Sequence, residues 1–472
     1  MDIAVVGTGY VGLVTSACLA DIGHQVIAVD NNQAKIAALQ QGQIPIYEPD
    51  LEDIVQRSTQ AGRLHFTTDL APAVKSSQVL FIAVGTPSLP SGDADMRFVE
   101  AVAKEIGQHL DDSYRVIVNK STVPIGSGDW VRMLVLEGAQ KVRQEQMAVV
   151  GTDGSGYRPD PPLLPNFDVV SNPEFLREGS AVWDTFNPDR IVVGSNSSQA
   201  LEIMRQLYNP IVERQAPFQS SRTTMKISSG PVPFVVTDLA SAEMIKYAAN
   251  ALLATKISFI NEIANICERV GADVTQVAHG IGLDSRIGSK FLNAGIGWGG
   301  SCFPKDISAL IHTAADYGYQ ARILESVIAV NRDQRQRIVE KLQQELKVLK
   351  GKTIGLLGLT FKPDTDDMRD APSRTIIQQL SKLGARVKAY DPIICSTGDH
   401  QELAEVMLES SALELAQGCD ALVLVTEWQE FHQIPWPQMA QSMRRPLIID
   451  ARNALDPAHL TQAGFYYVGV GR

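Results

Sequence analysis

The sequence has few cysteines, and their arrangement excludes two common uses of that residue. Only five occur among 472 residues, and none belongs to a C-x-x-C pair. An odd, scattered set fits neither a disulfide framework nor a zinc site. We therefore expect no bound metal and predict that the protein works in a reducing compartment, the cytoplasm.

Basic charge and long apolar runs are also scarce. The chain carries 42 Lys and Arg residues against 53 Asp and Glu residues, a net charge of −11, which argues against nucleic acid as a partner. The longest apolar stretches, such as 79–84, are far shorter than the ~20 residues of a membrane-spanning helix. The N-terminus enters a strand-like run directly, without the pattern of a signal peptide. We expect neither a nucleic-acid partner nor a membrane segment.

What the chain does contain is enough apolar sequence for a large core. Hydrophobic residues make up 44% of it and charged residues 20%, and at ~150 residues per domain the length predicts about three domains. β-branched runs alternate with helical stretches at both ends of the chain, which is typical of parallel, doubly wound sheets. The predicted fold is α/β, with two Rossmann-like domains joined by a long central helix. We place the boundaries at 1–208, 209–345 and 346–472.

Two segments depart from this alternation. Residues 238–270 contain neither Pro nor Gly and follow capping candidates, so they predict one long helix, which could also present an apolar face to a second copy of the chain. Residues 137–166 are polar and rich in Gly and Pro towards their end, and we interpret them as a surface insertion.

Gly7, Gly9 and Gly12 form the pattern G-x-G-x-x-G between a predicted strand and a predicted helix. Asp30 follows 18 residues after the last glycine, at the end of the next strand. In this context the glycines bring the backbone close to a pyrophosphate, and an acidic residue accepts hydrogen bonds from a ribose while repelling a 2′-phosphate. The pattern predicts NAD rather than NADP as the cofactor; the alternative is a glycine turn needed only for packing.

Two threonines follow buried strands, where ligands of doubly wound sheets bind. Thr86 follows the strand at 79–84, and Thr122 follows the strand at 116–119. Both are candidates for cofactor or active-site hydroxyls, although a Thr-Pro turn would serve equally well as a simple connection.

Two carboxylates and a Lys–Asn pair are further candidates for active-site residues. Residues 171–179 resemble a capped first helical turn with a proline at N1, which would place Glu174 and Glu178 on one face. Such acids often only complement the helix dipole, and we give the two interpretations equal weight. Lys246 and Asn250 are one turn apart in the long helix and could stabilise an oxyanion, or the lysine could simply be solvated.

The segment 295–306 is the most distinctive. Four glycines would let the backbone approach a ligand, and Pro304 marks the start of a helix. Cys302 then lies just before a helix N-terminus and beside Lys305, two features that favour a thiolate. A nucleophilic cysteine together with a hydride-accepting cofactor indicates oxidation through an aldehyde, a thiohemiacetal and a thioester. We interpret the other four cysteines as small core residues.

These motifs, in order along essentially the whole chain and with the segments 286–292 and 358–369, strongly resemble the UDP-glucose 6-dehydrogenase family. The resemblance implies an NAD-dependent, four-electron oxidation of UDP-glucose to UDP-glucuronate by a homodimer or higher homo-oligomer. Cys302 would be the nucleophile, while Lys246 and Asn250 would hold the C6 oxygen. Asp306 and Thr122 would position a water, and Glu174 would assist as a base in thioester hydrolysis.

The resemblance also implies the ligand contacts. NAD would meet Gly7, Gly9, Tyr10, Val11, Gly12, Asp30, Lys35, Thr86, Thr122, Glu178, Lys305 and Arg369. The sugar nucleotide would meet Glu174, Phe175, Leu176, Glu178, Lys246, Asn250, Arg286 from a partner subunit, Phe291, Gly299, Phe361, Lys362 and Arg452.

Two departures and two alternatives accompany this prediction. Trp298 stands where the family usually has Phe, and the segment 137–166 is longer than expected. Sister families oxidise UDP-N-acetylmannosamine or GDP-mannose on the same scaffold, but Phe303 after the cysteine resembles the UDP-glucose pattern more. A non-catalytic sugar-nucleotide-binding protein is disfavoured, because binding alone needs no Cys302, Lys246 or Asn250.

Overall fold

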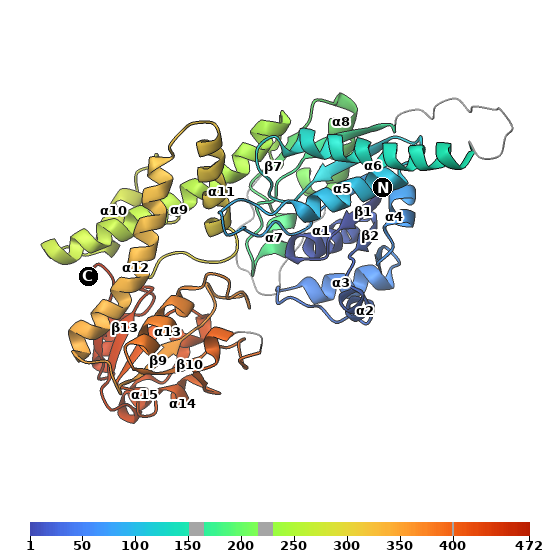
Figure 1. Cartoon of the computed structure of the whole chain (residues 1–472). Helices are drawn as coiled ribbons and strands as arrows, with labels where there is room; N and C mark the ends of the chain where they lie inside the picture. The colour runs from blue at the N-terminus through green and yellow to red at the C-terminus, as the bar shows by residue number, and fades with distance from the viewer. Residues whose placement is uncertain (151–164, 216–229, 399–400) are drawn as a thin grey trace. The chain divides into compact units, whose positions relative to one another are not determined.

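The computed structural model of the chain describes residues 1–150, 165–215, 230–398 and 401–472. These residues form two compact units, Met1–Ala248 and Ala249–Arg472, each built on its own sheet (Figure 1). The predicted α/β class, with two doubly wound sheets and a long central helix, is confirmed. The finer division into 1–208, 209–345 and 346–472 stays a prediction.

The first unit contains an eight-stranded sheet in the order β3-β2-β1-β4-β5-β6-β7-β8. Its central strands are short apolar segments with every residue buried, such as 79–82, which explains why helices cover both faces. The strands are β1 (Asp2–Val6), β2 (Gln25–Val29), β3 (Leu64–Thr67), β4 (Val79–Ile82), β5 (Arg115–Asn119), β6 (Phe167–Ser171), β7 (Ile191–Gly194) and β8 (Phe234–Thr237). The helices are α1 (Tyr10–Asp21), α2 (Gln33–Gln40), α3 (Leu51–Gln60), α4 (Leu70–Ser76), α5 (Arg97–His109), α6 (Ser127–Val150), α7 (Ala181–Phe186) and α8 (Ser198–Val212).

One edge of this sheet differs from the purely parallel arrangement predicted for it. β7 pairs with β6 in the antiparallel sense through Ser171 and Gly194, and β8 then runs parallel to β7. The connection from β6 to β7 contains only the six-residue helix α7, which spans about 9 Å. Ser171 is the last residue of β6 and Gly194 is the last residue of β7, so the two strands meet at their carboxyl ends and run in opposite directions.

The segment 137–166, which the sequence predicts to be a surface insertion, is helical in its first part. Residues 137–150 continue helix α6, and residues 151–164 lie outside the described part of the chain. A Cβ atom added at Gly138 would come within 2.0 Å of the Lys104 backbone oxygen, and one at Gly107 within 2.0 Å of the Val135 oxygen. Glycines therefore allow α5 and α6 to pack backbone against backbone, and this packing holds a polar segment in helical form.

Helix α9 (Leu239–Val270) is the long central helix that the sequence predicted, and the boundary between the two units falls within it. The second unit continues with helical segments and an all-parallel sheet in the order β11-β10-β9-β12-β13-β14. Its strands are β9 (Thr353–Leu357), β10 (Arg386–Tyr390), β11 (Met407–Leu408), β12 (Ala421–Leu424), β13 (Leu447–Asp450) and β14 (Tyr466–Val468). Its helices are α10 (Val274–Gly282), α11 (Phe303–Asp316), α12 (Arg322–Leu346), α13 (Pro372–Lys382), α14 (Ala412–Ala416), α15 (Trp436–Ser442) and α16 (Pro457–Gln462), with 3-10 turns η1 (Gln401–Leu403) and η2 (Gln429–Gln433).

None of the helices in the described ranges combines the length and the apolar character needed to cross a membrane.

Candidate functional site

The glycine loop after β1 has the geometry expected of a dinucleotide-binding turn. Gly7 has φ 101°, and an added Cβ would lie 2.6 Å from the Ala83 oxygen. At Gly12 an added Cβ would lie 1.8 Å from the Gly7 oxygen, whereas at Gly9 no atom of the described residues lies within 4 Å. Gly7 thus forms the turn, Gly12 allows α1 to pack on β1, and open space remains beside Gly9. That division of roles fits a pyrophosphate at the N-terminus of α1.

Asp30 follows β2 and is anchored to this loop. Its Oδ2 atom accepts hydrogen bonds from the Thr8 backbone nitrogen at 2.9 Å and from the Thr8 hydroxyl at 2.7 Å, and Lys35 Nζ lies 3.2 Å away. Burial opposes the charged form, but the hydrogen bonds from Thr8 and Asn32 and the charge of Lys35 outweigh it and lower the pKa of Asp30. The carboxylate is therefore held ionised beside the glycine loop, as ribose recognition requires.

The two threonines expected at the sheet edge lie together. The Thr86 hydroxyl donates a hydrogen bond of 2.7 Å to the Thr122 backbone oxygen, which ties the loop after β4 to the loop after β5. Since β1, β4, β5 and β6 are parallel, these loops and the glycine loop share one edge of the sheet. The structure thus brings Thr86 and Thr122 to the edge where the sequence predicts the cofactor.

Lys246 and Glu174 form a buried ion pair. Lys246 Nζ lies 2.8 Å from Glu174 Oε1, with side-chain exposures of 4% and 5%. Burial opposes the charge of Glu174, but Lys246 and a hydrogen bond from the Leu176 nitrogen outweigh it and lower the pKa of Glu174. The Phe175 ring lies beside this pair, with its centroid 5.5 Å from Lys246 Nζ. Two residues that the sequence predicts as catalytic, 72 positions apart, are therefore in direct contact.

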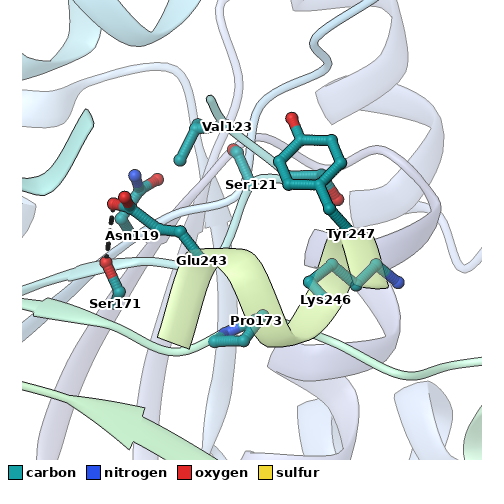
Figure 2. Close-up of a pocket in the computed structure, with 9 residues that line it drawn as sticks. Asn119, Ser121, Val123, Ser171, Pro173, Glu243, Lys246 and Tyr247 are labelled. Atoms are coloured by element: carbon teal, nitrogen blue, oxygen red, sulfur yellow. Dashed lines mark hydrogen bonds between the residues drawn. The ribbon is translucent and has the colours of Figure 1, made fainter. Parts of the chain in front are cut away.

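A narrow pocket adjoins this pair, and Figure 2 shows its walls. Glu243, Lys246 and Tyr247 contribute from α9, and the loops after β5 and β6 supply the opposite side. The Glu243 carboxylate accepts hydrogen bonds from the Ser171 hydroxyl at 3.0 Å and from the Gly126 and Gly128 nitrogens, so it fixes the start of α9 against the sheet edge. The pocket is lined by Asn119, Ser121, Thr122, Val123, Ser171, Pro173, Glu243, Lys246 and Tyr247.

The expected helical turn at 171–179 is absent, so Glu174 and Glu178 do not share a helical face. Ser171 ends β6, and α7 begins only at Ala181. Side chains of two other segments, one nearby in the sequence and one distant, accept backbone hydrogen bonds from this loop. Asp184 Oδ2 accepts from the Arg177 nitrogen at 2.9 Å. Glu48 Oε2 accepts from the Gly179 nitrogen at 2.7 Å and also from the Tyr10 hydroxyl.

In the second unit, Asn250 and Asp306 form the counterpart of the Lys246 pair. Asn250 Nδ2 donates a hydrogen bond of 2.6 Å to Asp306 Oδ2, and Lys305 Nζ donates one of 2.6 Å to Asp306 Oδ1. Asp306 is 1% exposed. Lys246 and Asn250 lie one turn apart on α9, and each binds a buried carboxylate.

Cys302 stands at the N-cap of α11. It is half-buried, its backbone oxygen accepts from the Asp306 nitrogen at 2.9 Å, and its sulfur lies 3.7 Å from the Ser301 hydroxyl. The position at a helix N-terminus, which the sequence predicts, favours a negative charge on the sulfur.

The glycines before Cys302 lie against other parts of the second unit. A Cβ added at Gly297 would lie 2.4 Å from Asn331 Oδ1, and one at Gly299 would lie 2.3 Å from the Asp370 oxygen. At Gly300 it would lie 2.8 Å from the Phe361 ring. These glycines leave room for neighbouring residues of the protein. The sequence did not indicate these contacts, because the contacting residues lie 34 to 71 positions downstream.

Three residues predicted to bind the sugar nucleotide gather at the carboxyl edge of the second sheet. Arg452 Nη2 donates to the Phe361 oxygen at 2.9 Å, Arg452 Nη1 donates to the Gly297 oxygen at 3.3 Å, and Lys362 Nζ lies 5.5 Å from the Phe361 ring centroid. Arg369 pairs with Asp367 at 2.8 Å. Arg286 instead pairs with Asp284 on the surface, with 86% of its side chain exposed, and Phe291 has φ 65° in a nearby loop.

Sequence reasoning missed three buried polar residues of the first unit. Lys120 and Asn119 lie at the end of β5, and Glu48 holds the loop that replaces the expected helical turn. Lys120 belongs to the segment 120–124 that the sequence singles out for its threonine. Its burial depends on the folded sheet edge, and no pattern in the sequence signals it.

Comparison with known proteins matches the chain along its length. Family models of the UDP-glucose/GDP-mannose dehydrogenase family match residues 1–212 as the NAD binding domain, 240–333 as the central domain and 355–457 as the UDP binding domain. UDP-glucose 6-dehydrogenase TuaD of Bacillus subtilis is 46% identical over 100% of this chain and 93% of its own length. UDP-glucose 6-dehydrogenase of Rhizobium meliloti is 44% identical over 100% of both chains.

The fold is also similar to that of a solved structure with the same kind of name. The UDP-glucose dehydrogenase of the archaeon Pyrobaculum islandicum is 34% identical, with a TM-score of 0.83 over 99% of this chain and 97% of that one. With the glycine loop, the buried Lys246 and Asn250 pairs and the N-cap cysteine in place, the chain belongs to the UDP-glucose/GDP-mannose dehydrogenase family.

Proposed function

We propose that this protein oxidises the C6 alcohol of UDP-glucose to the carboxylate of UDP-glucuronate. The observation that carries the proposal is the arrangement on α9, where Lys246 and Asn250 lie one turn apart and each binds a buried carboxylate. A cation and an amide donor in this register suit an oxygen that becomes negatively charged during the reaction. The curated UDP-glucose 6-dehydrogenases at 46% and 44% identity support the choice of sugar.

NAD, when bound, supplies the acceptor for the hydride in each of two oxidation steps. The glycine loop and the ionised Asp30 would hold it, with Tyr10, Val11, Lys35, Thr86, Thr122, Glu178, Lys305 and Arg369 as further proposed contacts. Gly9 provides the open space that a pyrophosphate needs, and the negative charge of Asp30 disfavours a 2′-phosphate.

The chain's own groups would then act on the sugar. In the first oxidation a hydride leaves the C6 carbon and a proton leaves its hydroxyl, while Lys246 and Asn250 stabilise the negative charge on the oxygen. The Cys302 sulfur adds to the resulting aldehyde to give a thiohemiacetal, which loses a second hydride from C6 and a proton from its hydroxyl to leave a thioester. Water, positioned by Thr122 and Asp306, then cleaves the C–S bond to release the acid and return the thiol. Glu174 assists this hydrolysis as a proton acceptor, and its lowered pKa keeps it in the ionised form.

The remaining proposed contacts concern the nucleotide and the sugar ring. Lys362 and Arg452 provide cations at the carboxyl edge of the second sheet, next to Phe361, where a diphosphate would need them. The other proposed contacts to the sugar nucleotide are Phe175, Leu176, Phe291 and Gly299. Because Cys302 must remain a thiol, we also propose the cytoplasm, a reducing compartment, as the location.

The proposal is tested by the number of NADH molecules formed per sugar consumed. Purified protein is mixed with NAD and, separately, with UDP-glucose, UDP-N-acetylmannosamine or GDP-mannose, and absorbance and sugar products are followed. We expect turnover with UDP-glucose at two NADH per sugar, and much weaker turnover when NADP replaces NAD. A ratio near one, or turnover only with one of the other sugars, would overturn the assignment.

We also propose that the protein is a homodimer or a higher homo-oligomer built on α9. Leu252, Phe259 and Ile266 are spaced seven residues apart on this helix and are 62%, 49% and 48% exposed. Residues seven apart share one face of a helix, and an exposed apolar stripe on a helix commonly marks an interface.

Phe259→Asp is expected to shift the protein towards monomers, because a buried carboxylate would face apolar side chains of the partner. Light scattering after gel filtration measures the molar mass, and the monomeric fraction should turn over UDP-glucose more slowly. Val348→Asp, which changes a 65% exposed valine outside α9, is the matched control. An unchanged oligomer in the Phe259 variant would contradict the proposed interface.

A further inference from the structure

Lys120 is a buried lysine at the end of β5, beside the loop that carries Glu174. It is 9% exposed, and its Nζ donates a hydrogen bond of 3.1 Å to Asn172 Oδ1. The Tyr208 hydroxyl donates to the same oxygen at 2.6 Å, and Asn172 Nδ2 donates to the Val192 oxygen at 2.7 Å. Among the described residues, this amide oxygen is the one acceptor of the Lys120 ammonium, and the Tyr208 ring centroid lies 6.0 Å away. A buried ammonium with so little direct compensation calls for an explanation.

The charged groups that act on Lys120 are Glu174 and Lys246, which are themselves paired at 2.8 Å. The buried cluster therefore contains two ammonium groups and one carboxylate. With all three ionised its net charge is +1. If Lys120 were neutral, the pair of Lys246 and Glu174 would have no net charge.

We propose that Lys120 is a positioning residue of the oxidation, which compensates the Glu174 carboxylate so that the positive charge of Lys246 acts on the C6 oxygen of the sugar. The inference rests on the function proposed above and assigns the second lysine of the cluster a role in it. An alkoxide developing near a cluster of charge +1 is stabilised, whereas near a neutral ion pair the attraction of Lys246 is largely cancelled by Glu174.

This role makes the reaction sensitive to the ionisation of Lys120. Burial, and to a smaller extent the charge of Lys246, lower the pKa of Lys120 to about 8, although Glu174 opposes the shift. The cluster therefore keeps its charge of +1 below this pH and loses it above. We expect turnover of UDP-glucose to fall as the pH rises through about 8, because deprotonated Lys120 no longer compensates Glu174.

The test compares Lys120→Met, which removes the charge and keeps the chain length, with Tyr208→Phe, which removes the other hydrogen bond to Asn172 and no charge. We expect kcat of Lys120→Met at pH 7 to fall about tenfold, with KM for NAD unchanged and the decline above pH 8 abolished. Tyr208→Phe should retain that decline. Lys120→Arg should keep much of the activity and remain active above pH 8, because arginine stays protonated.

Several results would overturn the proposal. These are a parent profile without a decline near pH 8, a Lys120→Met variant with the parent profile, or a Tyr208→Phe variant that matches Lys120→Met in rate and profile. The last result would assign Lys120 only to holding Asn172. If Lys120→Met does not fold, the parent, Lys120→Arg and Tyr208→Phe profiles decide the question alone.

A second measurement does not depend on turnover. It therefore distinguishes a failure of the inference about Lys120 from a failure of the proposed function. In the unfolded chain a lysine titrates near 10.4, above the pKa of about 8 in the folded protein. Between these values the unfolded state binds more protons, so stability rises with pH. The melting temperature of the parent relative to Lys120→Met should therefore rise between pH 8 and about 10. A constant difference would show that the cluster does not hold Lys120 as proposed.

Discussion

Replacing Cys302 with serine is expected to slow the release of UDP-glucuronate by on the order of 10³-fold or more. A serine hydroxyl is a far weaker nucleophile than a thiolate at neutral pH, and an oxygen ester that does form is cleaved by water more slowly than a thioester. The variant should therefore retain binding of both ligands but accumulate enzyme at the ester level. The mass of the intact protein, measured after mixing with UDP-glucose and NAD, reports that species directly.

Cys395→Ser is the matched control, because Cys395 is an exposed cysteine of the same unit and the proposed mechanism gives it no role. It should turn over UDP-glucose at the parent rate and show no added mass. Normal turnover by Cys302→Ser would mean that the N-cap sulfur of α11 forms no covalent bond to the sugar. The pattern of two NADH per sugar would then need another explanation.

The sequence predicted those parts of the site whose members are close together in the chain or follow a repeated pattern. The glycine loop, Asp30 after β2, the register of Lys246 and Asn250, and Cys302 before α11 all depend on local helix and strand periodicity. Local structure decides each of them, so the folded protein reproduces them.

The features that the sequence did not reveal depend on contacts between distant residues. In the non-helical loop after β6, Glu48 accepts a backbone hydrogen bond from Gly179, which lies 131 positions further along the chain. The space beside the glycines at 297–300 is occupied by Asn331, Asp370 and Phe361. The burial of Lys120 arises only when the ends of β5 and β6 meet α8. Such contacts are set by tertiary packing, which propensity and periodicity do not encode.

Lys246→Met is expected to lower kcat by on the order of 10²- to 10³-fold and also to destabilise the fold. The loss of activity follows from removing the cation that stabilises the C6 oxygen. The loss of stability follows because Glu174, which is 5% exposed, loses its direct partner, and breaking a buried pair from one side costs about 3 kcal/mol. Urea unfolding gives the free energy, and the initial rate of NADH formation gives kcat.

The double variant Lys246→Met/Glu174→Gln separates the two effects, because an uncharged amide in place of Glu174 needs no counter-ion. We expect it to recover most of the stability but none of the activity. If the double variant also recovered kcat, Lys246 would serve only to neutralise Glu174.

Acid pH provides a further check on the origin of the lost stability. The folded pKa of Glu174 lies below its usual value because of Lys246, so the pair stabilises the fold above a pH of about 4.3. This contribution disappears as the pH falls through the folded pKa and the carboxylate is protonated. The difference in unfolding free energy between the parent and Lys246→Met should therefore be largest near pH 7 and shrink towards pH 3. A difference that did not change with pH would mean that Lys246 stabilises the protein through the packing of its methylene groups and not through its charge.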